Sequence, residues 1–299
     1  MNITITGGTG FIGRRLVLRL LADGHSIQLL VRHARTGFGP QVRCSIWNAL
    51  DIEPAPGSLA GEDAVIHLAG DPVSQRWTPA AKRKIRDSRV EGTRRLVEAM
   101  SRLGRRPSVL VCASAIGFYG SRGDEILTEA SQPGEGFLSE LCTAWEAAAD
   151  LAEGLGLRVV KLRSGMVLGK EGGALAQMLT PFQWGLGGRV ALGSQWMSWV
   201  HVDDLVELIV FSLGRPGFRG PVNGASPNPV TNAEFTTALA SVLRRPALLT
   251  VPARALRLLY GEMAEMILGS QRVIPQALLS AGFEFRYPCL RPALQNLLA

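Results

Sequence analysis

The sequence predicts an α/β fold in which a doubly wound parallel sheet carries a smaller C-terminal substrate lobe. Two observations lead to this prediction. Short apolar strand patterns alternate with helical patterns as far as residue 168, which is typical of a parallel sheet with helices on both faces. A glycine-rich turn also joins the first strand to the first helix, and a turn of this kind indicates a nucleotide-binding sheet.

Strand patterns recur through this part of the chain, at residues 2–6, 26–31, 64–68, 108–113 and 158–162. Helical patterns separate them. The longest predicted helix begins at Thr78-Pro79, because an N-capping Thr followed by Pro at the first helical position is a strong start signal. Its pattern extends to about Leu103.

The predicted domain organisation follows from where this alternation stops. Residues 1–168, together with about 198–226, are expected to form the nucleotide-binding domain. Residues of about 169–197 and 227–299 break the pattern and are assigned to a substrate-side lobe. A glycine-rich stretch of this lobe holds aromatic residues that form either a platform for the substrate or a hydrophobic cluster: Trp184, Trp196 and Trp199.

Composition narrows the class of protein. Of 299 residues, 46% are apolar and 19% are charged, which is typical of a globular chain. The apolar runs are too short to cross a bilayer and the first residues leave no room for a signal peptide, so a soluble cytoplasmic protein is expected. The four cysteines form no CxxC pair, which favours reduced thiols, and the spacing of the four histidines predicts no metal site.

The net charge of +7 is concentrated in one segment. Residues 82–106 contain ten basic and three acidic residues, so this segment accounts for the whole excess. No aromatic residue is interleaved with these charges. A nucleic-acid partner is therefore not expected, and a phosphate-bearing small ligand is favoured.

The strongest motif is the glycine-rich turn itself. Gly7 permits the tight turn, Gly10 lets the backbone approach a pyrophosphate, and Gly13 allows the helix to pack closely on the strand. The N-terminus of the helix then offers free N–H groups to the phosphates. The residues predicted to bind the cofactor here are Gly7, Thr9, Gly10, Phe11, Ile12 and Gly13.

The end of the second strand predicts NADP(H) as the cofactor. A protein that prefers NAD usually has an acidic residue at this position, whereas this chain has Val31 and then Arg32, with Arg35 close behind. A guanidinium pairs well with a 2′-phosphate. The alternative is that Arg32 is a solvated loop residue. The later run Leu68-Ala69-Gly70 ends in small residues, which let the backbone lie close to the adenosine half of a cofactor.

Beyond these motifs, several segments resemble the extended short-chain dehydrogenase/reductases, the nucleoside-diphosphate-sugar epimerase-like kind. They are Ser114-Ala115-Ile116-Gly117-Phe118-Tyr119-Gly120 with Glu129, Leu162-Arg163-Ser164-Gly165-Met166-Val167-Leu168-Gly169, Trp199-Val200-His201-Val202-Asp203-Asp204-Leu205, and Asn223-Gly224 with Thr231-Asn232-Ala233-Glu234-Phe235. The resemblance implies a Rossmann-type sheet, a nicotinamide cofactor and a small-molecule substrate such as a sugar nucleotide or another carbonyl compound.

The C-terminal part resembles one atypical subgroup of this family. Residues 271–288 look like the small C-terminal domain of the subgroup usually labelled "epimerase family protein", and that domain is placed at 247–295. Family members often pair through two long helices, so the resemblance is consistent with a homodimer built on residues 79–103 and 138–155. The heavy charge of the first helix disfavours a dry interface there.

The chain departs from the family at its catalytic pair, a Tyr followed four residues later by a Lys. None of the three tyrosines has Lys at that spacing: Tyr119, Tyr260 and Tyr287. Alignment of the relevant helix puts Phe137 or Leu138 at the Tyr position, and Leu141 or Cys142 at the Lys position.

Two catalytic candidates remain at the end of the fourth strand. Ser114 is predicted to hold a substrate carbonyl or hydroxyl, and Tyr119 to donate a proton, with packing in the turn as the alternative for Tyr119. Arg89 replaces the Asn that is usual in the family and is expected to reach the cofactor.

Two functional hypotheses follow. The first is an NADP(H)-dependent oxidoreductase or epimerase that uses a substitute acid/base. The second is a non-catalytic NADP(H)-binding redox sensor or regulatory protein, which the missing catalytic pair favours.

Overall fold

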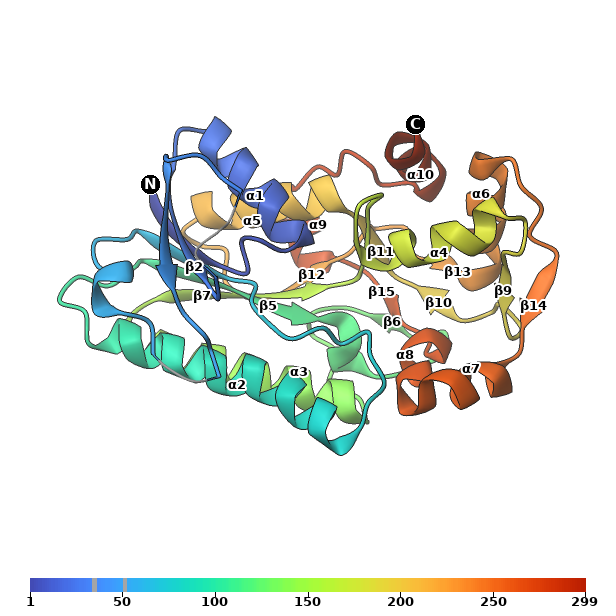
Figure 1. Cartoon of the computed structure of the whole chain (residues 1–299), viewed down its shortest axis with the longest axis horizontal. Coiled ribbons are helices and arrows are strands. Elements are labelled where there is room, and N and C mark those ends of the chain that lie inside the picture. The colour runs from blue at the N-terminus through green and yellow to red at the C-terminus, as the bar shows by residue number, and fades with distance from the viewer. Residues whose placement is uncertain (34–36, 51–52) are drawn as a thin grey trace.

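The central sheet has seven parallel strands in the order β12-β7-β5-β4-β1-β2-β3 (Figure 1). The computed structural model describes residues 1–33, 37–50 and 53–299. Its sheet strands are β1 (Asn2–Thr6), β2 (Ser26–Val31), β3 (Val42–Ile46), β4 (Ala64–His67), β5 (Val109–Ala115), β7 (Arg158–Ser164) and β12 (Gly220–Gly224). The strand order reverses between β1 and β4, and ligands of such sheets bind in the crevice at this point. The predicted Rossmann-type fold is confirmed.

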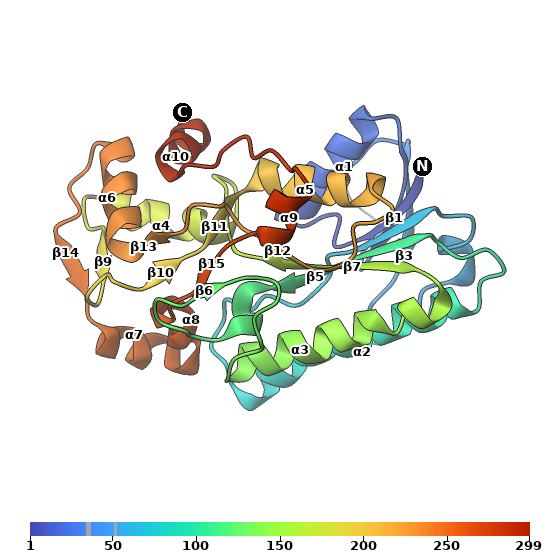
Figure 2. The ribbon, with the colours of Figure 1, turned by 180° about the vertical axis from the view of Figure 1, so that it is seen from behind.

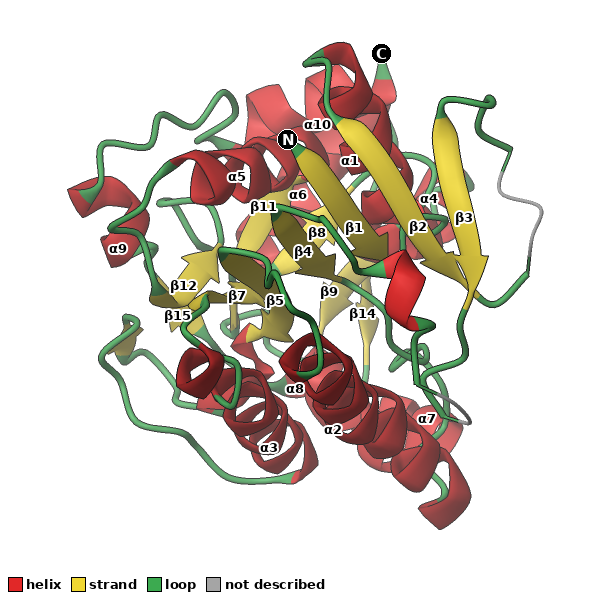
Figure 3. Cartoon of the chain, turned by 90° about the vertical axis from the view of Figure 1, so that its left-hand side faces the viewer, coloured by secondary structure: helices red, strands yellow, loops and turns green. Residues whose placement is uncertain are grey.

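Helices cover both faces of this sheet. Helices α1 (Phe11–Ala22) and α5 (Val202–Gly214) lie on one face, and α2 (Pro79–Ser101) and α3 (Phe137–Asp150) lie on the other (Figure 3). Successive side chains of a strand point to opposite faces, so each face has its own core. Val109 packs in the cluster that contains the α1 residues, whereas Leu110 packs with those of α2 and α3.

The start of α2 matches its sequence signal. The Thr78 hydroxyl accepts a hydrogen bond from the backbone N–H of Ala81 at 3.2 Å, and Pro79 follows as the first helical residue. The helix ends at Ser101, slightly before the predicted Leu103. The capped N-terminus of α2 lies toward the edge of the sheet that is formed by the carboxyl ends of the strands.

Two strands of the sheet, β3 and β12, were not among the five predicted strand ranges. Strand β3 is an edge strand, and three of its five side chains are exposed. Its sequence Val42-Arg43-Cys44-Ser45-Ile46 therefore lacks the apolar run that identifies a buried parallel strand. The register with β2 places it beside Val31, at the end of the sheet where Arg32 lies.

A smaller lobe follows the carboxyl ends of the strands. Its core joins α4 (Gly173–Gln183), α6 (Asn232–Leu243) and α10 (Leu290–Leu298). The short strands pair two by two: β8 (Met166–Leu168) with β11 (Trp199–His201), β9 (Gly188–Val190) with β14 (Leu249–Val251), and β10 (Trp196–Met197) with β13 (Val230–Thr231). The three tryptophans separate: Trp199 is fully buried in this core, Trp196 is half-buried, and Trp184 is 74% exposed.

The C-terminal segment returns to the part of the chain that forms the central sheet. It forms α7 (Ala253–Tyr260), α8 (Ala264–Leu268) and α9 (Gln276–Ser280), and its strand β15 (Arg272–Val273) pairs with β6 (Ile126–Leu127) (Figure 2). The buried carboxylate of Asp204, at the start of α5, accepts backbone N–H bonds from Arg286 at 2.8 Å and Tyr287 at 2.9 Å. The Tyr287 ring also stacks on His201, with 4.0 Å between ring centroids. These contacts fix the segment against the sheet.

Single-turn 3₁₀ helices complete the described chain, at Pro56–Ser58, Ile116–Tyr119, Glu153–Leu155 and Gly261–Met263. Among the residues that the structure describes, no helix combines the length and the apolar character needed to span a bilayer.

Candidate functional site

The glycine-rich turn lies at the crevice, between the end of β1 and the start of α1. Gly7 has a φ of +71°, and a Cβ on it would lie 2.8 Å from the backbone carbon of Leu68. A Cβ on Gly13 would lie 2.2 Å from the carbonyl oxygen of Gly7, so only glycine lets the helix pack this closely. The geometry of both residues agrees with the roles predicted for them.

Gly10 has a different environment, because its surroundings are open. It is exposed, and the only atom near the place of an added Cβ is the Gly7 oxygen at 3.3 Å. Thr9 beside it is also exposed. The first N–H groups of α1 therefore face open space next to a residue without a side chain, the arrangement that admits a phosphate.

Phe11, the first residue of α1, contacts the loop that follows β8. A Cβ on Gly169 would lie 2.1 Å from the Phe11 ring, and one on Gly172 would lie 2.6 Å from it. Ile12 packs on the core of the sheet. Of the predicted turn residues, these two serve packing with their side chains, so a ligand would meet their backbone.

The end of β4 is locked to the end of β1. The Thr6 hydroxyl lies 2.7 Å from Nδ1 of His67, and it also accepts the backbone N–H of Ala69 at 3.1 Å. His67 is fully buried, and its Nε2 has no hydrogen-bond partner within the described residues. Burial, with help from the nearby Arg89 guanidinium, lowers the pKa of His67 to about 4. The imidazole is therefore neutral at pH 7, and its role is to support the structure of the crevice.

Charged side chains gather at the end of β2. Val31 is buried, and the next residue, Arg32, has a side chain that is 70% exposed. Its Nη1 lies 4.0 Å from the buried carboxylate of Asp71, which Lys84 of α2 also contacts at 2.9 Å. Arg35, which was predicted to assist Arg32, lies outside the described residues.

Arg89 lies beneath the loop that follows β4. Its Nη1 donates to the carbonyl oxygens of Asp71 at 2.9 Å and Ile85 at 3.2 Å. A Cβ on Gly70 would lie 2.9 Å from its guanidinium carbon. Burial lowers the pKa of Arg89. Arg89 is therefore tied to Asp71, the residue directly after the loop Leu68-Ala69-Gly70, and its guanidinium packs against Gly70.

Ser114, at the end of β5, belongs to a buried polar network. Its hydroxyl donates to Glu146 of α3 at 2.7 Å, and only 3% of the residue is exposed. Glu146 in turn receives two hydrogen bonds of 2.8 Å from Arg163 of β7. A bidentate pair of this kind is short and directional. The Ser114 proton is thus committed to Glu146, while its oxygen can still accept a hydrogen bond.

Tyr119 is the other end of the same network. Its hydroxyl donates to Asn223 at 2.6 Å and accepts from Arg163 at 3.0 Å, and the residue has no exposed surface. The backbone N–H of Asn223 is bound by Glu129 at 3.0 Å. Burial raises the pKa of Tyr119, against the opposing effect of Arg163. The structure places this phenol in the packing position that was the alternative to a proton donor.

The positions of the missing Tyr and Lys lie on the first turns of α3. Leu138 and Cys142 face the turn after β5: a Cβ on Gly117 would lie 3.1 Å from the Leu138 Cβ and 3.8 Å from the Cys142 Sγ. Phe137 packs edge-on against Trp77 instead. Burial raises the pKa of Cys142 to about 11, so this thiol carries no charge at neutral pH and does not replace a lysine.

Several residues of this region were not predicted as site residues. Arg163 lay within a segment that carried the resemblance and Glu146 lay on the helix that was aligned with the family, yet neither spacing nor charge showed that they meet. Asp71 follows the predicted loop directly, and an acidic residue next to that loop was a usable signal. Lys84 gave no signal, because it is one of ten basic residues in its segment.

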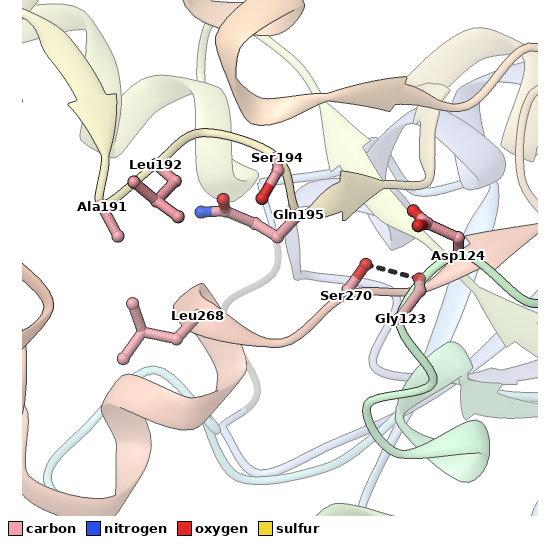
Figure 4. Close-up of a pocket in the computed structure, with 8 residues that line it drawn as sticks. All are labelled: Gly123, Asp124, Ala191, Leu192, Ser194, Gln195, Leu268 and Ser270. Atoms are coloured by element: carbon pink, nitrogen blue, oxygen red, sulfur yellow. Dashed lines mark hydrogen bonds between the residues drawn. The ribbon is translucent and has the colours of Figure 1, made fainter.

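An open cleft of about 360 Å³ lies where the domain and the lobe meet (Figure 4). Three distant segments line it: Gly123 and Asp124, the turn from Ala191 to Gln195, and the C-terminal Leu268 and Ser270. The Ser270 hydroxyl donates to the Gly123 oxygen at 2.7 Å and so joins two of these segments. Asp124 accepts the indole N–H of Trp196 at 2.7 Å. Within the described chain, no cluster of three or more His, Cys, Asp or Glu has the geometry of a metal site.

Known protein families match two parts of the chain. Residues 3–222 match the NAD dependent epimerase/dehydratase family. The chain belongs to this family. Residues 251–297 match a domain of unknown function, DUF1731. The resemblance to the atypical "epimerase family protein" subgroup is thereby confirmed.

Relatives named as epimerase family proteins share the full length of the chain. The chloroplastic SDR39U1 homolog of Arabidopsis thaliana is 43% identical, over 100% of this chain and 87% of its own. YfhF of Bacillus subtilis is 37% identical, over 100% of this chain and 98% of its own.

Solved structures are similar over the same length. The human epimerase family protein SDR39U1, crystallised with NADPH, is 33% identical, with a TM-score of 0.88 over 99% of both chains. A nucleoside-diphosphate sugar epimerase from Corynebacterium glutamicum is 35% identical, with a TM-score of 0.82 over 100% of this chain and 58% of its own.

The neutral state of His67 predicts a pH dependence of stability. The pKa of His67 is about 4 in the folded protein and 6.5 without burial, so its stabilising contribution is complete above pH 6.5 and is lost as the pH falls toward 4. Replacing it (His67→Gln) should flatten the pH dependence of the unfolding free energy in this window by about 3 kcal/mol. Urea unfolding at several pH values measures this. The exposed His33→Gln is the control, and an unchanged slope in His67→Gln would contradict the prediction.

The buried Glu146–Arg163 pair predicts a large stability loss. Arg163→Met leaves Glu146 as a buried charge without a partner, so the unfolding free energy should fall by about 3–5 kcal/mol. The double variant with Glu146→Gln should lose less than the sum of the two single variants. Arg105→Met, which breaks the exposed pair with Asp63, should cost about 1 kcal/mol or less. Equal losses at Arg163 and Arg105 would refute this view of the network.

Proposed function

We propose that the protein is an NADP(H)-dependent oxidoreductase or epimerase that acts on a small hydroxylated or carbonyl substrate. The observation that carries the proposal is the open, side-chain-free start of α1 at Gly10, with the exposed guanidinium of Arg32 at the end of the neighbouring strand. The chain is similar over its whole length to a protein crystallised with NADPH, and this similarity supports the choice of cofactor.

The residues at the crevice fit this cofactor. The backbone from Gly10 to Gly13 would bind the pyrophosphate, because an added Cβ at Gly10 meets only one atom and the helix N–H groups face outward. Arg32 would bind the 2′-phosphate. The locked end of β4, from Leu68 to Gly70, would border the adenosine. When bound, the cofactor supplies hydride transfer, and the protein orients it and the substrate.

The substrate is proposed to enter through the cleft between the domain and the lobe. Asp124 and Ser194 are exposed there, and Leu192 and Leu268 add apolar surface. This mixture suits a hydroxylated molecule with an apolar face. Ser114 makes no substrate contact in this proposal, because only 3% of the residue is exposed and its proton is held by Glu146. Tyr119 takes no part in proton transfer in this proposal, because its hydroxyl is fully buried and used twice.

A non-catalytic NADP(H)-binding sensor is the second candidate. A specific observation favours it: the two positions that face the turn after β5 hold Leu138, which has no ionisable group, and Cys142, whose thiol is uncharged at neutral pH. In a sensor, binding of the cofactor would be reported through the C-terminal segment, which contacts both the domain and the lobe.

Titration of NADPH and NADH into the cofactor-stripped protein tests both candidates. Mass spectrometry of small molecules that copurify with the protein, and the slow oxidation of bound NADPH, then separate them. Tight NADPH binding with a copurified carbonyl or sugar supports the enzyme. Tight binding without a second ligand or any oxidation supports the sensor, and absence of binding to either nucleotide overturns both.

Charge reversal at Arg32 tests the cofactor assignment. Arg32→Glu replaces an attraction with a repulsion at the 2′-phosphate, so NADPH affinity should fall by about 100-fold while NADH affinity changes by about threefold or less. Isothermal titration with both nucleotides measures this. The exposed Arg215→Glu, far from the crevice on the C-terminal side of α5, is the matched control. Equal losses for both nucleotides would exclude the assignment.

A further inference from the structure

The buried carboxylate of Asp71 lies between two exposed cations. Lys84 Nζ is 2.9 Å from Oδ2 of Asp71, and Arg32 Nη1 is 4.0 Å from Oδ1. The Asp71 side chain is 9% exposed, whereas those of Lys84 and Arg32 are 59% and 70% exposed. The carboxylate is thus buried in the protein, and the two positive groups beside it face solvent.

Asp71 is held rigidly by α2. Its backbone N–H donates to the Ser88 hydroxyl at 3.1 Å, and its carbonyl oxygen accepts from Arg89 at 2.9 Å. Lys84 and Ser88 are one helical turn apart, so the same face of α2 that fixes the Asp71 backbone also supplies the lysine. The Asp71 carboxylate, whose backbone is fixed by α2, therefore sets the position of the Lys84 ammonium.

The charges of this group do not balance. One carboxylate faces two exposed cations, which leaves one positive charge at the end of β2, beside the crevice at the point where the strand order reverses between β1 and β4. Lys84 also borders an open cleft of about 600 Å³ along α2, with Leu50, Asp87, Glu91 and Arg95, so its ammonium has space beside it. A phosphate monoester carries a charge of about −1.5 to −2 at pH 7, so it would be attracted to the uncompensated positive charge between Lys84 and Arg32.

We propose that Lys84 is the second cation of the 2′-phosphate site and that it makes the protein select NADPH over NADH. The inference rests on the proposed function, because it assumes that the cofactor lies in the crevice. Arg32 reaches the phosphate from the end of β2, Lys84 reaches it from α2, and Asp71 sets the distance between them. Two positive groups from different elements bind a phosphate more specifically than one mobile guanidinium.

Binding of both nucleotides to single variants tests the inference. Lys84→Ala should raise the Kd for NADPH about tenfold, while the Kd for NADH should change by about twofold or less. Lys84→Arg keeps the charge and should retain most of the selectivity. The effect should shrink as the salt concentration rises, because exposed charges are screened. Arg83→Ala, an exposed residue next to Lys84 on the same helix, makes the same change in net charge and should leave both Kd values unchanged.

The outcomes separate this inference from the proposed function. If the unchanged protein binds NADPH tightly and Lys84→Ala affects neither nucleotide, or both equally, the role of Lys84 is overturned and the proposed cofactor stands. If Arg83→Ala has the same effect as Lys84→Ala, general charge rather than position is responsible, and the inference fails. If the unchanged protein binds neither nucleotide, the proposed function itself fails, and the inference fails with it.

Discussion

The buried pair of Glu146 and Arg163 connects the elements on which the site depends. Through this pair, α3 is joined to β7, and the Ser114 and Tyr119 hydroxyls at the end of β5 are joined to both. Removing two charges from water is costly, and good geometry with further hydrogen bonds has to offset that cost. Here every member has its partners, and the guanidinium also lies 3.5 Å above the Phe118 ring. This network therefore holds the ends of β5 and β7 and helix α3 in their relative positions.

The same network contains both residues that were predicted to be catalytic. A serine and a tyrosine at a strand end suggested a catalytic pair, yet the hydroxyl of each is a hydrogen-bonding partner in the core. Meanwhile, the helix that would carry the acid/base pair presents Leu138 and Cys142. The polar groups that remain accessible lie farther out, in the cleft shared by the domain and the lobe (Figure 4).

The sequence was sufficient for features that depend on local chemistry. The turn at Gly7, the packing at Gly13 and the cap at Thr78 follow from backbone geometry, so their residue types reveal them. Strand β3 was missed because an edge strand needs no apolar run. The Asp71–Lys84 contact was beyond reach, and the burial of Tyr119 was only one of two alternatives, since each depends on which elements meet in space. The tertiary partner, not the residue type, decides those cases.

The contact between Asp204 and the backbone at Arg286 and Tyr287 bears on how such a chain evolves. The C-terminal segment matches a separate domain description, which suggests a module that recombination could exchange. A substitute that did not offer two N–H groups at the same place would leave a carboxylate buried without donors at the start of α5. The boundary that the sequence match gives is therefore crossed by a contact that any exchanged segment would have to reproduce.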